Sequence, residues 1–205
     1  MGCDRRDRRR DTVGVPPDAR AGRLAVMSDA TTIDPASPLD RDLTDAVART
    51  ADAAQRLADE LPDLLDARGW TVATAESLTG GTIASVLAAA PSAQEWFRGS
   101  VVAYTPEVKF GLLGVPEGPV VTEECARTMA TSTARLLGAD LVVAVTGVGG
   151  PEPDEGEPAG TVWFAVVSPD GVHTEKVVFD GDPAEVLTRT SQAAIGLLRD
   201  TARRD

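Results

Sequence analysis

Two polar, glycine-rich turns each follow an apolar segment, and they are the places in this sequence where side chains could do chemistry. Residues 76–81 read Glu-Ser-Leu-Thr-Gly-Gly, and residues 146–151 read Thr-Gly-Val-Gly-Gly-Pro. Ligands of open α/β sheets bind beyond the carboxyl ends of the strands, and free N–H groups at a helix start can bind an anion or an oxyanion. Neither turn matches a standard phosphate-binding or serine-hydrolase motif. The alternative for each turn is a tight strand-to-helix connection, with Ser77 or Thr79 as the N-cap.

The lysine content directs attention to one further residue. Only Lys109 and Lys176 are lysines among the 20 basic residues. Arginine does not release its proton in proteins, whereas a desolvated lysine does. Lys109 lies among apolar residues, five positions after Tyr104, the only tyrosine. A partly buried amine there could act as a general base with a lowered pKa, and the alternative is a helix lysine whose stem covers apolar surface.

The composition limits the function classes. The chain has 205 residues, a formal charge of −12 and 42% hydrophobic residues, which suits one domain with a tail. The acidic balance argues against a nucleic-acid binder, and no apolar run is long enough to span a bilayer. Two cysteines, Cys3 and Cys125, cannot make a disulfide framework or a cysteine zinc site. One histidine, His173, excludes multi-histidine metal sites and leaves little room for a Ser-His-Asp triad. A small cytoplasmic enzyme without histidine chemistry, or a binding module, remains.

The hydrophobic pattern predicts alternating strands and helices that would position these turns. Strands are predicted at residues 70–75, 99–104, 141–145, 161–167 and 172–179. Helices are predicted from residue 39 to 68 with a break at Pro62, and at 82–90, 106–113, 122–137 and 183–199. Ser168-Pro-Asp-Gly171 is a strong hairpin turn. This order predicts an α/β fold, a three-layer α/β/α domain with a mixed, mostly parallel sheet and a β-hairpin in the C-terminal half. Lys176 and His173 are expected on the solvated face of the last strand.

The first 38 residues have a different composition from the rest. Arginines outnumber aspartates over residues 1–28, and residues 30–38 are rich in Thr, Asp, Pro and Ser. There is no apolar segment of the kind a secretory signal needs. We expect residues 1–38 to be a disordered leader and linker, with the natural start at Met27, and residues 39–205 to form the domain. A basic arm that touches an acidic partner is the alternative.

Six sequence blocks in a fixed order resemble the CinA C-terminal domain family, over about residues 39–198. The blocks are Thr74-Ala-Glu-Ser-Leu-Thr-Gly-Gly81, Tyr104-Thr-Pro-Glu-Val-Lys-Phe-Gly-Leu-Leu-Gly-Val115, Val121-Thr-Glu-Glu124, Gly138-Ala-Asp140, Val145-Thr-Gly-Val-Gly-Gly-Pro151 and Gly160-Thr-Val-Trp163. The family includes deamidases that hydrolyse nicotinamide mononucleotide (NMN) to nicotinic acid mononucleotide and ammonia. The resemblance implies the α/β/α fold predicted above, a cytoplasmic enzyme of NAD salvage that is commonly a homodimer, a small nucleotide substrate, and no metal or cofactor.

The resemblance also implies roles for individual residues. Ser77 would be the nucleophile, Lys109 its base, and Tyr104 would position or relay the proton. A serine hydroxyl needs a neighbour to take its proton, and a neutral lysine can do so. The substrate-binding residues implied are Glu76, Thr79, Gly80, Gly81, Thr146 and Gly147. Of these, the glycine turn would donate to the oxyanion or phosphate, and Glu76 would orient the lysine or bind ribose, or else brace the turn.

The sequence departs from the family pattern at four places. Leu78 stands where the family usually has cysteine, and Thr105-Pro106 replaces a Ser-Asn pair. Carboxylates occupy the loop at 152–157, and Pro183 and Leu187 stand where the family has arginines. These departures motivate two alternatives to NMN hydrolysis. One is a catalytically degenerate module that binds a nucleotide or a protein, and the other is a hydrolase of a different, unphosphorylated small amide.

Overall fold

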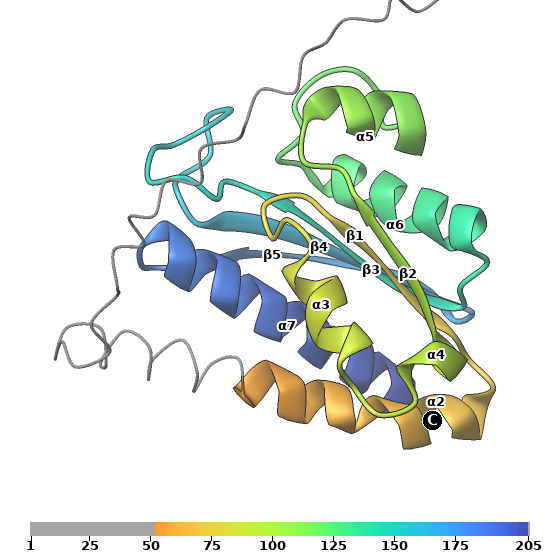
Figure 1. The fold of residues 1–205 in the computed structure, drawn as a ribbon. Coiled ribbons are helices and arrows are strands. Elements are labelled where there is room, and N and C mark those ends of the chain that lie inside the picture. Colours follow the sequence, from red (N-terminus) through yellow and green to blue (C-terminus); the bar gives the residue numbers. More distant parts are fainter. Residues whose placement is uncertain (1–51, 205) are drawn as a thin grey trace, which may run out of the picture. The chain divides into compact units, whose positions relative to one another are not determined.

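Residues 52–204 are described by the computed structural model, and they contain a five-stranded sheet flanked by helices (Figure 1). The strands are β1 Val72–Glu76, β2 Phe97–Val102, β3 Leu141–Gly147, β4 Thr161–Ser168 and β5 Gly171–Val178. The helices are α2 Leu61–Arg68, α3 Thr82–Ala88, α4 Ala93–Trp96, α5 Pro106–Leu113, α6 Glu123–Leu137 and α7 Pro183–Arg203. Residues 52–59 are helical as well. The predicted leader, its boundary with the domain at residues 38–39 and the predicted helix up to residue 51 lie outside the described residues.

The sheet has the order β2-β1-β3-β4-β5. β1 pairs in parallel with β2 and β3, whereas β4 is antiparallel to both β3 and β5. Strand β4 therefore runs against the other four, and β4 and β5 form the predicted hairpin, in which Ser168 is opposite Gly171. The prediction of a mixed, mostly parallel sheet with a hairpin in the C-terminal half is confirmed.

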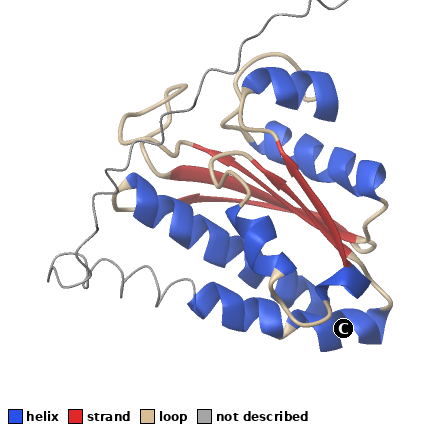
Figure 2. Ribbon diagram, viewed as in Figure 1, coloured by secondary structure: helices blue, strands red, loops and turns tan. Residues whose placement is uncertain are grey.

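Helices cover both faces of the sheet, which confirms the predicted three layers (Figure 2). One face packs against α2, α3 and α7 around a core that includes Leu61, Ile83, Phe164 and Ile195. The other face packs against α5 and α6 around a core dominated by small residues, of which Met129 is the largest fully buried member of α6. Small side chains on this second face let α6 lie close to the sheet. None of the helices over residues 52–204 is apolar for a long enough stretch to cross a bilayer.

Local sequence signals explain where the helices begin and end. Thr122 caps α6 by accepting a hydrogen bond from the Cys125 backbone N–H at 3.1 Å, and Gly138 ends the helix with a φ of 62°. The break predicted at Pro62 is present, since this proline lies in the first turn of α2. The four-residue helix α4 was not predicted, because so short a segment has no helical periodicity, and β2 begins two residues earlier than expected.

The register of the parallel strands determines which loops meet. Glu76, the last residue of β1, is opposite Val102 of β2 and Val145 of β3. Because the carboxyl ends of parallel strands share one edge of the sheet, Ser77 lies between the segments that begin at Ala103 and Thr146. The backbone N–H of Ala103 also donates to the Glu76 carbonyl at 2.7 Å, which extends the pairing by one step.

Candidate active site

The buried carboxylate of Glu76 organises the turn between β1 and α3. Its side chain is fully buried and accepts six hydrogen bonds. The donors are the backbone N–H groups of Gly81, Ile83 and Ala84 and the hydroxyls of Thr74, Thr79 and Ser100. A carboxylate is favourable at this end of a helix, where unpaired N–H groups carry partial positive charge. These contacts fit the bracing role for Glu76, because both oxygens are occupied within the protein.

The same bonds use the donors that the glycine turn was expected to offer a substrate. The Gly81 N–H lies 3.0 Å from a Glu76 carboxylate oxygen, and the Thr79 hydroxyl lies 2.8 Å from the same oxygen. The Gly80 N–H donates to the Ser77 carbonyl at 3.0 Å. Of the donors at Thr79, Gly80 and Gly81, only the Thr79 backbone N–H has no acceptor in the described part of the chain. The sequence pattern cannot show that a carboxylate from the preceding strand occupies the other donors at this helix start.

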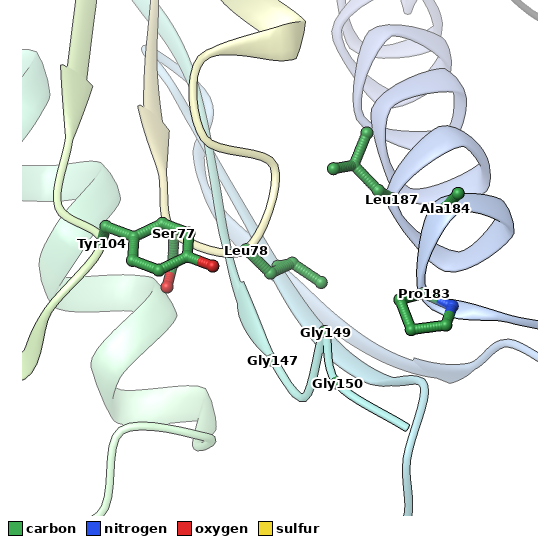
Figure 3. Close-up of a pocket in the computed structure, with 9 residues that line it drawn as sticks. All are labelled: Ser77, Leu78, Tyr104, Gly147, Gly149, Gly150, Pro183, Ala184 and Leu187. Carbon is green, nitrogen blue, oxygen red and sulfur yellow. The ribbon is translucent and has the colours of Figure 1, made fainter. Parts of the chain in front are cut away.

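Ser77 opens on a cavity of about 430 Å³ at the carboxyl edge of the sheet (Figure 3). Ser77 is 7% exposed. The cavity is lined by Ser77, Leu78, Tyr104, Gly147, Gly149, Gly150, Pro183, Ala184 and Leu187. No acceptor among residues 52–204 takes the backbone N–H groups of Leu78, Gly149 and Gly150, which flank this cavity. The Leu78 N–H belongs to the residue directly after the expected nucleophile.

Lys109, on α5, is 1% exposed and is the largest fully buried side chain of the described residues. Its Nζ donates to the Tyr104 carbonyl at 3.2 Å. Burial lowers the pKa of Lys109 below its ordinary value of 10.5, and the nearby Cys125, Glu155 and Glu107 partly oppose that change. An amine with a lowered pKa is the condition for a lysine general base.

Ser77 follows β1, and Lys109 lies on the helix that follows the neighbouring strand β2. The two side chains share no direct hydrogen bond in the described part of the chain. Tyr104 links the two regions, because its ring lines the cavity with Ser77 while its carbonyl accepts from Lys109 (Figure 3). Tyr104 is 66% exposed, so its main chain rather than its hydroxyl contacts the lysine. Catalytic hydrogen bonds are often long before substrate binds, so proton transfer would need a side-chain movement or a bridging water.

Thr146 and Gly147 end β3 on the other side of Ser77. The Thr146 hydroxyl donates to the Val120 carbonyl at 2.8 Å, so it holds a loop instead of facing the cavity. Gly147 lines the cavity, and a Cβ at this position would come within 2.3 Å of the Thr161 carbonyl oxygen. Only glycine allows β3 and β4 to approach so closely here. Of these two predicted residues, Gly147 is the one at the cavity wall.

Two residues near Lys109 were not proposed from the sequence as site residues. Burial raises the pKa of the Cys125 thiol to about 11, and the neighbouring Thr146 hydroxyl and the charge of Lys109 partly oppose this. Glu155, in the acidic loop, accepts hydrogen bonds from the backbone N–H groups of Val120 and Val121, both at 2.7 Å. Nothing local in the sequence distinguishes Glu155 from the other carboxylates of its loop, because its partners are 34 and 35 residues away.

The remaining wall of the cavity is uncharged. Pro183, Ala184 and Leu187, from the first turns of α7, lie across the cavity from Leu78 (Figure 3). The start of α7 is capped by its own residues. The Asp182 carboxylate accepts a hydrogen bond from the Glu185 backbone N–H, and the Glu185 carboxylate accepts one from the Asp182 backbone N–H, both at 2.9 Å. The cavity-lining residues within 52–204 therefore include neither lysine nor arginine.

The sequence is similar to that of CinA-like proteins. The model of the CinA C-terminal domain family matches residues 54–202. A CinA-like protein of Frankia casuarinae is 40% identical over 141 residues, which cover 66% of this chain and 33% of that protein. A CinA-like protein of Fervidobacterium nodosum is 37% identical over 147 residues, or 69% of this chain and 36% of that protein. The chain thus spans about a third of the length of these relatives.

Solved structures agree with this assignment. A CinA superfamily protein from Klebsiella pneumoniae superposes with a TM-score of 0.70 at 34% identity, covering 73% of this chain and 97% of that one. One from Escherichia coli gives 0.69 at 36% identity, covering 71% and 89%. The family match covers most of the chain, and the structural likeness covers the same layers and sheet. The protein belongs to the CinA C-terminal domain family.

Proposed function

We propose that this protein is an amidohydrolase that uses Ser77 as nucleophile and Lys109 as general base, with NMN as its substrate. One observation carries the proposal. A serine that opens on a cavity lies at the same sheet edge as a fully buried lysine whose pKa is lowered. The substrate and the amide hydrolysis come from the family resemblance, and the cavity serine and buried lysine support nucleophilic catalysis.

The reaction would proceed in two halves. The Ser77 oxygen attacks the amide carbonyl carbon while its proton passes to the neutral Lys109 amine, directly or through water. The tetrahedral intermediate collapses, and the nitrogen leaves as ammonia after taking the proton from Lys109. Water then attacks the acyl-serine, again losing its proton to Lys109, and release of the acid returns that proton to Ser77. No group other than substrate and water is consumed.

The developing oxyanion needs donors that are free before the reaction. Leu78, Gly149 and Gly150 line the cavity with Ser77, and their backbone N–H groups have no acceptor among residues 52–204. Because backbone amides are held by the fold, they need no reorganisation as charge develops, and removal of one such donor typically costs about 3 kcal/mol of barrier. We assign the oxyanion site to this group in place of Thr79, Gly80 and Gly81.

The direct test is ammonia release from NMN by the purified protein. We expect Ser77→Ala to lose most of the activity, and Ser168→Ala, a serine at the β4–β5 hairpin, to keep it. Isothermal calorimetry with NMN accompanies the assay. Binding of NMN without ammonia release would support a binding module instead of an enzyme, and full turnover by Ser77→Ala would remove Ser77 as the nucleophile.

A second candidate function is hydrolysis of an unphosphorylated amide. The observation that favours it is the uncharged cavity wall, together with the α7 start that is already capped by its own carboxylates. A phosphate binds best where arginine, lysine or free N–H groups meet it. Comparison of kcat/KM for NMN and nicotinamide riboside separates the two candidates, since recognition of the phosphate makes NMN the better substrate.

A further inference from the structure

The acidic loop after β3 contains one carboxylate with a structural partner on another loop. Glu155 has a φ of 51°, in the left-handed region that non-glycine residues rarely adopt. Its Oε2 atom accepts both the Val120 and the Val121 backbone N–H at 2.7 Å. Two successive N–H groups that converge on one oxygen make a small anion-binding concavity. Glu155 therefore binds the loop before α6 through charge-assisted hydrogen bonds.

The loop that Glu155 binds also contacts Thr146 and Cys125. The carbonyl of Val120 accepts a hydrogen bond from the Thr146 hydroxyl at 2.8 Å. Thr122 caps α6 by accepting a hydrogen bond from the backbone N–H of Cys125, which lies in the first turn of that helix. Cys125 is 1% exposed. Thr146 and Cys125 are thus held by the same short segment, residues 120–122, that the Glu155 carboxylate fixes.

We propose that Glu155 is a positioning residue of the amidohydrolase site, which holds segment 120–122 and, through it, Cys125 in place near Lys109 and Thr146 at the end of β3. This inference rests on the proposed function for its catalytic consequence. From the sequence, the carboxylates of this loop were only a departure from the family pattern. Glu155 instead points its charge at backbone N–H groups and contributes to the surroundings of the base.

Electrostatics supports the geometric argument. The charged and titratable groups that face Lys109 are Cys125 on α6, Glu107 on α5 and Glu155 on the loop. The negative charge of Glu155 raises the pKa of Lys109 and so moderates the lowering that burial causes. Of the two carboxylates, Glu155 alone also binds segment 120–122, which contacts Thr146 and caps the helix that contains Cys125.

Two substitutions of Glu155 separate its charge from its hydrogen bonds. Because one oxygen accepts both N–H groups, the amide oxygen of Glu155→Gln can keep segment 120–122 in place while the charge is lost. Glu155→Ala removes both the charge and the acceptor. Glu152→Gln is the matched control, since Glu152 is an exposed carboxylate of the same loop with no side-chain hydrogen bond among the described residues.

Two measurements on these variants test the proposal. NMR of protein labelled with ¹³C at lysine Cε gives two signals, because Lys109 and Lys176 are the only lysines. We expect Glu155→Gln to titrate Lys109 at a lower pH than the wild type and to leave Lys176 unchanged. Ammonia release is then measured against pH. Glu155→Ala should lower kcat about tenfold or more, since small displacements of catalytic groups have effects of this size. Glu155→Gln should restore most of kcat, with the acid limb at lower pH.

The inference is overturned if Glu155→Gln leaves the Lys109 titration at the wild-type position, or if Glu155→Ala has the kcat of Glu152→Gln. Circular dichroism and melting temperature establish that each variant is folded before it is compared. Absence of ammonia release by the wild type would count against the proposed function alone, because the NMR titration requires no turnover.

Discussion

The side-chain nitrogen of Lys109 lies 3.2 Å from the backbone carbonyl oxygen of Tyr104, and this contact closes the turn from β2 into α5. It fixes a buried amine at the carboxyl end of a strand that is the direct neighbour of β1. Since Ser77 follows β1, the base and the nucleophile of the proposed reaction are positioned by two adjacent parallel strands. Their relative placement therefore depends on the sheet, which is more rigid than a loop.

The rate of ammonia release should depend on pH through Lys109. The amine must be uncharged to accept a proton, so activity is low below its pKa and rises as the pH rises through it. Burial lowers this pKa from the ordinary 10.5, and the acid limb is therefore expected below the pH at which an exposed lysine titrates. A pH–kcat profile checks this, and a limb that follows an ordinary lysine pKa would contradict the buried base.

Replacement of Lys109 should separate catalysis from stability. Lys109→Met is expected to lose about 100-fold or more in kcat, the usual contribution of a positioned base. Lys109→Arg should be equally inactive, because arginine keeps its proton. The folded state lowers the pKa of Lys109, so it binds fewer protons than the unfolded state as the pH rises toward 10.5. The stability of the wild type relative to Lys109→Met should thus increase with pH over that range, as urea unfolding would measure.

Much of the fold was predictable because the signals were local. The hairpin turn Ser168–Gly171, the cap at Thr122 and the proline at position 62 each determine a boundary through their own backbone chemistry. A continuous apolar run such as residues 141–145 is typical of a strand buried on both faces, and β3 lies at the centre of the sheet. Helix α4 was not predicted, because its four residues carry no periodic signal.

The site was less predictable because its decisive contacts join distant segments. The resemblance to the family named Ser77 and Lys109, and the lysine count drew attention to Lys109, which is buried. The occupied donors of the glycine turn were not foreseen, since they depend on Glu76 turning back onto the helix that follows it. The role of Glu155 was hidden for a different reason, because its partners come from another loop, 34 and 35 residues away.

Glu76→Gln should destabilise the protein strongly. The amide would place an NH₂ group where the carboxylate now accepts hydrogen bonds, and buried donors would be left unpaired. Loss of a buried, hydrogen-bonded charge of this kind costs roughly 3 kcal/mol or more. Glu95→Gln, at an exposed carboxylate on α4, is the control and should leave the melting temperature nearly unchanged. Equal melting temperatures for the two variants would show that Glu76 does not brace the turn.

Two glycine-to-alanine substitutions should have opposite effects. In Gly147→Ala the new Cβ would lie 2.3 Å from the Thr161 carbonyl, so β3 and β4 must separate at the cavity wall. Overpacking of this kind costs about 1–3 kcal/mol, and we expect reduced activity as well. Gly111→Ala, inside α5, meets no atom within 4 Å and should stabilise the protein by about 0.5–1 kcal/mol. Thermal unfolding of both variants measures the contrast.

Leu187→Arg should shift substrate preference toward the phosphorylated amide. Leu187 is half-buried, lines the cavity from α7 and lies one turn after the helix start, so an arginine there could place its guanidinium at the cavity. A charge-assisted bond to phosphate of about 1.5 kcal/mol would lower KM for NMN about tenfold. Nicotinamide riboside lacks the phosphate and should not benefit. Leu187→Gln, which adds a polar group without charge, is the control. If the arginine and glutamine variants lower KM for NMN equally, the phosphate does not reach this side of the cavity. The uncharged wall would then not explain a preference between the two substrates.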